Sequence, residues 1–249
     1  MSTSNGATKA AIVTGASRGI GRAIALRLAR DGFAVVVNYA GRRDDAEAVV
    51  SEIERSGGRA VAVQADVSDP AQAAGLFERA EGAFGGGVDV LVNNAGLLQV
   101  SPLAETDDAA FGRLVAVNIA GAFNMMREAA RRLREGGRIV NLSSSALATS
   151  LPGYGAYNAT KAAVEAMTRV LAKELGPKRI TANAVAPGPV ATELFFDGKS
   201  PEQVARMAAL SPLNRLGEAD DIAPVVSFLA GPEGGWVNGQ VVRANGGLG

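Results

Sequence analysis

The sequence predicts a single α/β domain, in which a parallel sheet of about seven strands is covered by helices on both faces. Three observations support this fold class. Short apolar segments alternate with longer helical patterns, several of these segments are apolar at almost every position, and a glycine-rich turn follows the first one. Strands buried on both faces of a parallel sheet have such continuous apolar runs. Regular alternation of strands and helices is typical of the doubly wound Rossmann fold.

Seven segments rich in Val, Ile and Ala are the predicted strands. They are residues 10–14, 34–38, 60–64, 88–93, 138–142, 181–185 and 240–243. Helical patterns cover residues 19–30, 44–56, 70–84, 107–134, 154–175, 201–210 and 218–229. Pro70 and Pro201 each follow a residue that can cap a helix, which favours helices that start there. Gly85-Gly86-Gly87 is typical of a turn and too short for a linker, so we expect residues 1–249 to form one domain.

The composition excludes several classes of function. The 249 residues include no His and no Cys, which excludes Ser-His-Asp and Cys-His catalysis, disulfides, and zinc sites built on these ligands. The 25 Lys and Arg residues balance 25 Asp and Glu residues, so charge gives no case for nucleic acid or an anionic membrane as a partner. No apolar run approaches the roughly 18 residues of a membrane-spanning helix. The polar start lacks a signal-peptide pattern, so we expect a cytoplasmic protein.

The first predicted strand runs into a glycine-rich turn, Thr14-Gly15-Ala16-Ser17-Arg18-Gly19-Ile20-Gly21. Its G-x-S-x-G spacing is also that of a nucleophile elbow, but such a serine needs a histidine base, which the chain lacks. The other interpretation is a turn that binds the pyrophosphate of a dinucleotide, because glycines let the backbone approach closely and the next helix offers unpaired N–H groups. The position within a βαβ unit favours dinucleotide binding over a purely structural turn.

The end of the second strand indicates which dinucleotide is bound. NAD-binding proteins usually have an acid there that accepts from the ribose 2′-OH, whereas this strand ends at Asn38. Arg18 lies in the glycine turn, and Arg42 and Arg43 follow the strand. Guanidinium groups bind phosphate through paired, charge-assisted hydrogen bonds. The sequence therefore favours NADP over NAD; the alternative is that Arg42 and Arg43 belong to an ordinary solvated loop.

A tyrosine and a lysine four residues apart are the candidate catalytic pair. Tyr157 and Lys161 share one face of a predicted helix. A tyrosine ordinarily has a pKa near 10, and a neighbouring ammonium group would lower that pKa. Three serines, residues 143–145, follow the strand 138–142, and ligands bind at the carboxyl ends of parallel strands. The alternative is a half-buried tyrosine beside a surface lysine, with loop serines that only cap a helix.

Taken together, the motifs resemble the short-chain dehydrogenase/reductase family over residues 9–247. The motifs that carry the resemblance are Thr14-Gly15-x-x-x-Gly19-x-Gly21, Asp66-Val67, Asn93-Asn94-Ala95-Gly96, Asn118, the serines at the strand end, Tyr157-x-x-x-Lys161, and Pro187-Gly188 with Thr192. Each motif alone is modest, whereas their joint order is specific. Within the family, the chain is similar to 3-oxoacyl-[acyl-carrier-protein] reductases and related carbonyl reductases.

The resemblance implies a set of catalytic residues. Tyr157 would be the general acid in reduction and the general base in oxidation, and Lys161 would lower its pKa and bind the nicotinamide ribose. The family's catalytic serine lies thirteen positions before the tyrosine, which selects Ser144. It would orient and polarise the substrate oxygen. Asn118, within the predicted helix 107–134, would hold a water in a proton relay to Lys161.

The resemblance also implies how NADP would be held, without a metal ion. Asp66 would accept a hydrogen bond from the adenine amino group, residues 93–96 would approach the adenosine ribose and brace the sheet, and residues 187–192 would flank the nicotinamide carboxamide. The predicted cofactor-binding residues are Gly15, Ser17, Arg18, Gly19, Ile20, Gly21, Asn38, Asp66, Val67, Asn93, Ala95, Gly96, Tyr157, Lys161, Pro187, Gly188, Val190 and Thr192.

Residues 190–216 correspond to the segment that covers the substrate in the family. A mainly apolar pocket for a small carbonyl or alcohol substrate is predicted from Leu97, Leu98, Leu151, Tyr154, Leu194, Phe195 and Phe196. Met207 and Leu210, in the same segment, are expected to belong to the core or to a subunit interface.

The sequence thus predicts an NADPH-dependent oxidoreductase that reduces a ketone, such as a 3-oxoacyl thioester, to a secondary alcohol. The alternative is a non-catalytic NADP-binding regulatory protein on the same fold. Such a protein would be expected to have lost the tyrosine or the lysine, and this chain keeps both. The resemblance further implies a homotetramer, with helices 107–134 and 154–175 packed between subunits.

Overall fold

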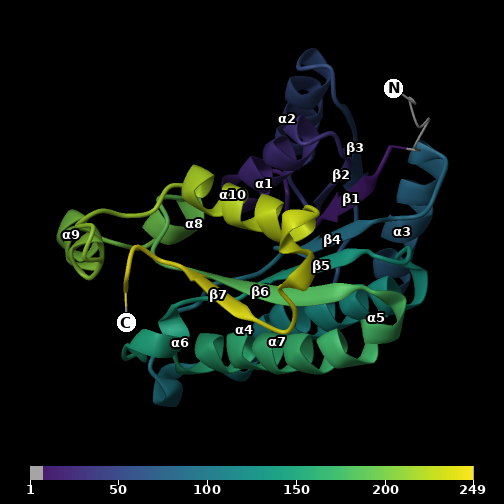
Figure 1. The fold of residues 1–249 in the computed structure, drawn as a ribbon. Coiled ribbons are helices and arrows are strands. Elements are labelled where there is room, and N and C mark those ends of the chain that lie inside the picture. The colour runs from purple at the N-terminus through teal and green to yellow at the C-terminus, as the bar shows by residue number, and fades with distance from the viewer. Residues whose placement is uncertain (1–7, 249) are drawn as a thin grey trace.

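One parallel sheet organises the part of the chain that this computed structural model describes, residues 8–248 (Figure 1). Its seven strands lie in the order β3-β2-β1-β4-β5-β6-β7, and all neighbours pair in parallel. The strands are β1 (Ala10–Val13), β2 (Ala34–Tyr39), β3 (Arg59–Gln64), β4 (Val90–Asn93), β5 (Arg138–Leu142), β6 (Thr181–Pro187) and β7 (Val241–Ala244). The predicted Rossmann-type fold class is therefore confirmed.

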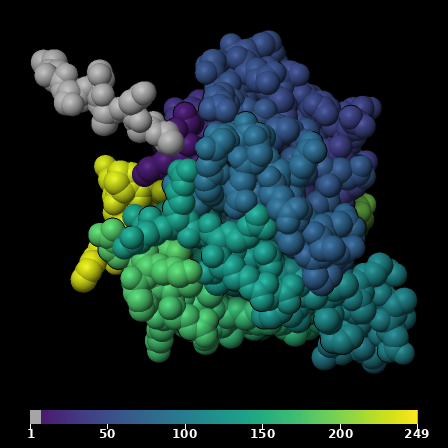
Figure 2. Space-filling model, turned by 90° about the vertical axis from the view of Figure 1, so that its right-hand side faces the viewer, coloured from purple at the N-terminus to yellow at the C-terminus, as the bar shows by residue number. Residues whose placement is uncertain are grey.

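Helices cover both faces of the sheet (Figure 1). One face carries α1 (Gly19–Arg30), α2 (Arg43–Arg55) and α10 (Ala219–Ala230). The other carries α3 (Pro70–Phe84), α4 (Asp108–Leu114), α5 (Ala122–Arg132) and α7 (Gly155–Glu174), and Figure 2 shows α3, α5 and α7 packed side by side. Each face of the sheet has its own hydrophobic core. Along β1, Val13 packs in the core beside α1, α2 and α10, and Ile12 packs in the core beside α3, α5 and α7. This alternation explains why the strands are apolar at almost every position.

Shorter helices connect the main layers. They are η1 (Leu103–Glu105), α6 (Ala146–Thr149), η3 (Gly176–Lys178), α8 (Glu193–Phe196), α9 (Pro201–Ala209) and η4 (Glu233–Trp236). Asp69 caps α3 and Ser200 caps α9 through their side chains, as the Asp-Pro and Ser-Pro pairs predict. Gly85, with a φ of 72°, ends α3 in a left-handed conformation, so the three glycines form a turn as expected.

The predicted helix 107–134 differs from the structure, because it is not one regular α-helix. Between α4 and α5 lies a π-helical segment, η2 (Val115–Gly121), which contains the buried Asn118. A Cβ at Gly121 would lie 2.7 Å from Val67 Cγ2, so the glycine permits this close packing. The apolar period of the sequence cannot reveal the extra residue per turn. Such π segments frequently occur at functional sites.

The helical stretch Asp108–Arg132 has the length and the mean hydropathy, 1.3, of a helix that could cross a membrane. The sequence contains no uninterrupted apolar run of about 18 residues, but this stretch, which polar residues interrupt, still reaches that length and hydropathy. Helices of soluble cores pass the same test, and Leu114, Met125 and Ala129 of this stretch are buried inside the protein. Packing inside the protein thus explains part of the apolar character of this stretch. A single helix of this kind is weak evidence that the protein spans a membrane.

The sheet topology creates the place for a ligand. β1 and β4 are neighbours at the centre, and the chain continues to β2 and β3 on one side and to β5, β6 and β7 on the other. Open α/β sheets bind ligands in the crevice beyond the carboxyl ends of the strands at such a switch point. The glycine turn follows β1 and residues 94–96 follow β4, so both lie at this crevice.

Candidate active site

A groove of about 470 Å³ lies beyond the carboxyl ends of the strands, with the glycine turn at one end and α7 at the other. Most of the predicted site residues line it. They are Gly15, Ser17, Arg18, Gly19, Ile20, Gly21, Asn38, Asp66, Val67, Ala95, Gly96, Ser144, Tyr157, Lys161, Pro187, Gly188, Val190 and Thr192. Asn93 and Asn118 are buried and are not among the lining residues. The groove therefore brings together motifs that are far apart in the sequence.

Glycines and an asparagine shape the turn after β1. Gly15 and Gly19 have φ values of 61° and 55°, a left-handed conformation that favours glycine. Gly21 lies so close to the main-chain oxygen of Gly15 and to the Asn94 amide that a Cβ would collide with both. Asn94 Nδ2 donates to the main-chain oxygens of Thr14 and Gly15, each at 3.0 Å. The turn is thus fixed from the end of β4 as well as by its own glycines.

The N-terminus of α1 opens into the groove. Within residues 8–248 no side chain caps α1, and its first turn contains no acid. Arg18, Gly19 and Ile20, at the start of this 12-residue helix, line the groove. Uncapped N–H groups at the positive end of a helix dipole suit an anion such as pyrophosphate. The residues present therefore fit a dinucleotide, as the sequence predicts.

Asn38, at the end of β2, braces the turn. Its side chain is 2% exposed. Its Oδ1 accepts from the main-chain N–H of Gly15 at 3.1 Å, and its Nδ2 donates to the main-chain oxygen of Ala65 at 3.0 Å. The amide therefore joins β2 to the turn and carries no charge. A carboxylate is absent from the position that, in NAD-binding proteins, usually receives the ribose 2′-OH.

Two of the three predicted phosphate-binding arginines lie at the groove. Arg18 and Arg42 line it, and each has an ion pair with Glu193, at 2.7 Å and 3.3 Å. Arg43 is the first residue of α2, is not among the lining residues, and pairs with Glu47 at 3.8 Å. Arg43 therefore lies outside the groove, whereas Arg42, half exposed, lies at its edge.

The predicted adenosine-binding residues divide into two groups. Asp66 and Val67 line the groove after β3, and Asp66 Oδ1 accepts from the N–H and the hydroxyl of Ser68 at 2.9 Å and 2.7 Å. Asn93 lies inside the sheet, where its Nδ2 donates to Asn141 Oδ1 at 2.9 Å. Asn93 therefore braces β4 against β5, while Ala95 comes to the groove wall.

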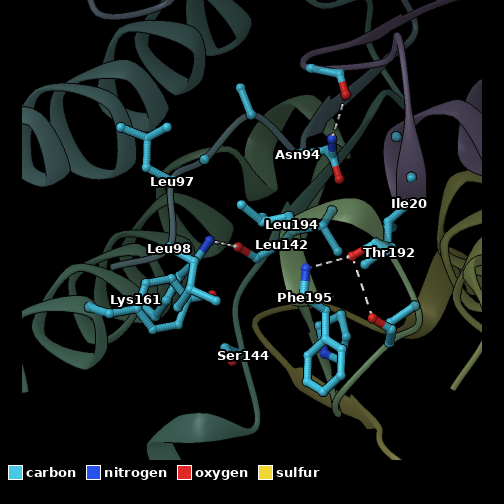
Figure 3. Close-up of a pocket in the computed structure, with 18 of the residues that line it drawn as sticks. Ile20, Asn94, Leu97, Leu98, Leu142, Ser144, Lys161, Thr192, Leu194 and Phe195 are labelled. Carbon is cyan, nitrogen blue, oxygen red and sulfur yellow. Dashed lines mark hydrogen bonds between the residues drawn. The ribbon is translucent and has the colours of Figure 1, made fainter. Parts of the chain in front are cut away.

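Tyr157 and Lys161 lie on one face of α7, as predicted. Lys161 is 6% exposed, and its Nζ lies 5.7 Å from the centre of the Tyr157 ring. The same Nζ donates to the main-chain oxygen of Leu142, the last residue of β5, at 2.8 Å. Figure 3 shows Lys161 directed at Leu142, with Ser144 nearby. The tyrosine–lysine pair is thus anchored to the strand end that carries the serines.

Burial dominates the ionisation of both groups. It raises the pKa of Tyr157 to about 12, although the hydrogen bond with Ser144 opposes the rise. It lowers the pKa of Lys161 to about 8. The sequence predicts instead that Lys161 lowers the pKa of the tyrosine. In the protein alone the desolvation of the buried phenol outweighs that effect, and the ammonium group is directed at a main-chain oxygen. A phenol that keeps its proton at neutral pH can act as a general acid.

The three serines after β5 have different surroundings. Ser143 is buried and donates to Glu165 Oε1 at 2.7 Å. Ser145 is buried, donates to the main-chain oxygen of Ala186 at 3.0 Å, and accepts from Asn245 Nδ2 at 3.0 Å. Ser144 accepts from the N–H of Ala146 at 3.2 Å and shares a hydrogen bond with Tyr157. Of the three serines, Ser144 is therefore the one whose hydroxyl interacts with Tyr157 in the groove.

Asn118 lies behind the groove wall in the π-helical segment. Its Oδ1 accepts from the N–H of Leu97 at 2.8 Å, and its Nδ2 donates to the main-chain oxygen of Leu97 at 2.9 Å and to Thr160 Oγ1 at 3.1 Å. A Cβ at Gly96 would lie 3.4 Å from Asn118 Oδ1 and 3.6 Å from Lys161 Nζ. Asn118 thus fixes the chain after β4 next to the lysine.

Apolar side chains line the groove around Tyr157. They are Leu97, Leu98, Leu151, Tyr154, Leu194, Phe195, Met207 and Leu210. Figure 3 shows Leu97 and Leu98 on the side of Lys161, and Thr192 with Leu194 and Phe195 across from them. Met207 and Leu210 line the groove and do not belong to the core, while the other expectation for them, a subunit interface, stays a prediction. Phe196 is not a lining residue and is 46% exposed.

Two residues that sequence reasoning missed are important for the geometry. Glu193 forms ion pairs with Arg18 and Arg42. No sequence motif points to this residue, apart from its position directly after Thr192. Asn245, after β7, holds Ser145 and packs so closely on Gly188 that a Cβ there would lie 3.0 Å from the Asn245 Cα. Long-range contacts of this kind have no local pattern in the sequence.

The fold and groove together define a class of protein, an oxidoreductase with a Rossmann-type dinucleotide groove that ends at a serine, a tyrosine and a lysine. A family model described as enoyl-(acyl carrier protein) reductase matches residues 15–249. The chain belongs to the short-chain dehydrogenase/reductase family, NAD(P)-dependent enzymes that act on CH–OH and C=O groups. The family resemblance and the enzyme class expected from the sequence are therefore confirmed.

The chain is similar to other proteins of this kind over nearly its whole length. It is 52% identical to an NADPH-dependent aldehyde reductase-like protein, chloroplastic, of Arabidopsis thaliana, over 97% of this chain and 94% of the relative. It is 52% identical to a short-chain type dehydrogenase/reductase of Picea abies, over 96% and 92%. Among solved structures, angucycline C-6 ketoreductase LanV with bound NADP matches with a TM-score of 0.91 and 38% identity, over 96% and 95% of the chains.

Proposed function

We propose that the protein reduces a ketone on an apolar small molecule to a secondary alcohol, with NADPH as the reductant. The observation that carries the proposal is the arrangement of Ser144, Tyr157 and Lys161 in the same groove as the uncapped start of α1. The names of relatives support the cofactor and the reaction, since one is an NADPH-dependent aldehyde reductase-like protein and another is a ketoreductase with bound NADP.

The residues that would hold NADP follow from the groove. The glycine turn and the start of α1 would receive the pyrophosphate, Arg18 and Arg42 the 2′-phosphate, and Asp66 the adenine amino group. Ala95 and Gly96 would lie at the adenosine ribose, and Pro187, Gly188, Val190 and Thr192 at the nicotinamide carboxamide. When bound, NADPH supplies the hydride for the carbonyl carbon.

The protein's own residues supply orientation and a proton. Ser144 donates a hydrogen bond to the substrate carbonyl oxygen and holds it beside Tyr157. The Tyr157 hydroxyl gives its proton to the same oxygen as negative charge develops there. A tyrosine of ordinary pKa already keeps its proton at neutral pH, and burial raises the pKa of Tyr157 further, so the phenol begins the reduction in its acid form. Lys161, held by Leu142, stabilises the phenolate that remains, which helps the phenol to give up its proton.

Asn118 would complete the proton path. Its side-chain amide is used by Leu97 and Thr160, so we propose that its main-chain oxygen, in the π-helical segment, accepts from the water that relays a proton to Lys161.

The substrate we propose is uncharged around its carbonyl group. Among the described residues that line the groove around Tyr157, the side chains are mainly leucine, phenylalanine, tyrosine and methionine. A buried charge at such a wall would be costly without a partner. A 3-oxoacyl thioester and a polycyclic aromatic ketone both satisfy this condition, and the ketoreductase LanV acts on an angucycline by its name. Residues 190–216 would cover the substrate in either case.

A homotetramer belongs to the same proposal. The helices expected between subunits carry exposed apolar side chains: Phe111 on α4 and Phe123 on α5 are each 47% exposed, and Val170 on α7 is 56% exposed. Trp236 in η4 is 99% exposed. Apolar groups of this size at the surface are typical of interfaces. Light scattering should give a mass near four subunits, and a mass near one subunit would refute the tetramer.

The experiment that tests the function is a substrate screen. NADPH oxidation is followed with a panel of β-ketoacyl thioesters, polycyclic quinones, steroids, sugars and small aldehydes, and with Tyr157→Phe as the control. Turnover of at least one carbonyl compound by the wild type and not by the variant would support the proposal. NADPH binding without turnover of any compound would favour the alternative, a regulatory binding protein. The cytoplasmic location stays a prediction, since the name of the Arabidopsis relative includes the chloroplast.

A further inference from the structure

Glu193 joins the two arginines that the proposed function assigns to the 2′-phosphate of NADP. Its Oε2 lies 2.7 Å from Arg18 Nη1 and 3.3 Å from Arg42 Nη1. Arg18 comes from the glycine turn and Arg42 from the loop before α2, so these guanidinium groups meet at a single carboxylate oxygen. Such a cluster of two guanidinium groups around one anionic oxygen is also how proteins bind phosphate.

The position of Glu193 is fixed by the chain around it. The preceding residue, Thr192, packs against the glycine turn, since a Cβ at Gly19 would lie 3.3 Å from Thr192 Cγ2. Thr192 also caps α8 by accepting from the N–H of Phe195 at 3.2 Å. As the first residue of α8, Glu193 is therefore held next to the turn that contains Arg18.

The two arginines depend on Glu193 to different degrees. Within residues 8–248, Arg18 has no other ion pair, whereas Arg42 also pairs with Asp45 at 3.3 Å. All the carboxylates and guanidinium groups concerned are at least 43% exposed as side chains. A phosphate that binds Arg18 and Arg42 through their Nη1 groups would therefore compete with Glu193 for the same donors.

We infer that Glu193 competes with the 2′-phosphate of NADP(H) for Arg18 and Arg42, and thereby sets the affinity and the selectivity for the cofactor. The inference rests on the proposed assignment of these arginines to the phosphate. A cofactor with the phosphate must break the ion pairs of Glu193, whereas NADH has no such group and leaves them intact. Glu193 therefore weakens the binding of NADPH and NADP⁺ selectively, which promotes the release of the oxidised cofactor after each turnover.

Exposed ion pairs contribute little each, and this limits the size of the effect. We expect Glu193→Gln to bind NADPH about three- to tenfold more tightly than the wild type. The affinity for NADH should stay within about twofold, because no phosphate competes in that case. The same variant should bind adenosine 2′,5′-bisphosphate more tightly, since this fragment carries the phosphate without the nicotinamide.

The test is isothermal titration calorimetry of the full chain with NADPH, NADH and adenosine 2′,5′-bisphosphate. The matched control is Glu47→Gln, which removes a carboxylate from a neighbouring arginine pair, that of Arg43, and should leave all three affinities unchanged. Circular dichroism and thermal unfolding check that each variant is folded. Unchanged or weaker NADPH binding by Glu193→Gln would overturn the inference, as would an equal gain for NADH or an equal gain in the control.

Arg18→Met separates this inference from the proposed function. If the variant binds NADPH as tightly as the wild type, the assignment of Arg18 to the phosphate fails. If it loses NADPH affinity while Glu193→Gln gains none, the phosphate assignment stands and only the competition fails. In the double variant the gain from Glu193→Gln should shrink, because the main cation for which the two anions compete is gone.

Discussion

Lys161 Nζ donates a hydrogen bond to the main-chain oxygen of Leu142 at 2.8 Å, and the lysine is buried at this contact. The bond joins α7 to the end of β5, one residue before the serines begin. It therefore fixes the distance between the helix that carries Tyr157 and the loop that carries Ser144. The lysine has a structural task in addition to its charge, and its variants will report on both.

Lys161→Met tests the cost of burying the ammonium group. Burial lowers the pKa of the folded protein's lysine from 10.5 to about 8, so between these pH values the unfolded chain binds more protons than the folded one. The unfolding free energy of the wild type should then rise with pH through this window, relative to the variant. Below about pH 8 both states carry the proton and the whole cost is present. Chemical denaturation of both proteins near pH 7.5 and near pH 10 measures the difference, and a difference independent of pH would contradict the assignment.

Tyr157→Phe removes the proton donor and little else. The ring keeps its edge contact with Tyr154, whose centre lies 6.3 Å away, so the fold and the affinity for NADPH should be unchanged. Turnover of a ketone should fall by at least about a hundredfold, since a positioned general acid contributes this much or more. Steady-state kinetics and a cofactor titration check the two halves of the prediction. A variant that still reduces ketones would remove Tyr157 from the mechanism.

The serines allow a matched comparison. Ser144→Ala should lower kcat by about tenfold or more with little change in stability, because its hydroxyl is directed to the site rather than to a buried partner. Ser145→Ala should instead destabilise the fold by about 1–3 kcal/mol, because it leaves Ala186 and Asn245 without their buried partner. Thermal unfolding and kinetics of both variants distinguish the roles, and the reverse pattern would assign catalysis to Ser145.

The fold could be predicted from the sequence because its signals are local. β1 and the first four residues of β2 are apolar because they contact a core on each face, and α3 begins where Asp69 and Pro70 predict. The π-helical segment could not be predicted, and the close packing of its last residue, Gly121, against the distant Val67 is likewise a contact between separate parts of the chain. Local periodicity contains no information on that contact.

The sequence predicted most residues of the candidate site, but it did not predict how these residues interact. The pairing of Tyr157 with Lys161 on one helix face follows from a spacing of four residues. The upward shift of the Tyr157 pKa does not follow from this spacing, because it is caused by burial in the folded protein. The role of Glu193 could not be predicted either, because its partner Arg18 lies 175 positions earlier in the chain. Charge pairs across such separations require the fold to be known.

Arg18→Met tests the preference for NADPH over NADH, which the groove favours through two arginines and the uncharged Asn38. The wild type should bind NADPH at least about tenfold more tightly than NADH, because a hydrogen bond to a charged group contributes about 1.5–3 kcal/mol. The variant should lose most of this preference and keep its affinity for NADH. Equal affinities of the wild type for the two cofactors, measured by titration, would defeat the prediction.

Gly21→Ala tests the packing of the glycine turn against the end of β4. A Cβ at this position would collide with the main-chain oxygen of Gly15 and with the Asn94 amide, which itself holds the turn. Neither atom can move without distorting the turn, so the variant should lose about 1–3 kcal/mol of stability and most of its affinity for NADPH.

The matched control for that variant is Gly75→Ala in the middle of α3, where a Cβ would meet nothing within 4 Å. Alanine favours the helix by about 0.5–1 kcal/mol over glycine, so this variant should be more stable and should bind NADPH normally. Thermal unfolding and cofactor titration of both variants give opposite signs of stability change if the close contact is what requires Gly21. If Gly21→Ala binds NADPH as well as the control does, the turn tolerates a side chain, and the close approach of its backbone to the cofactor is not needed.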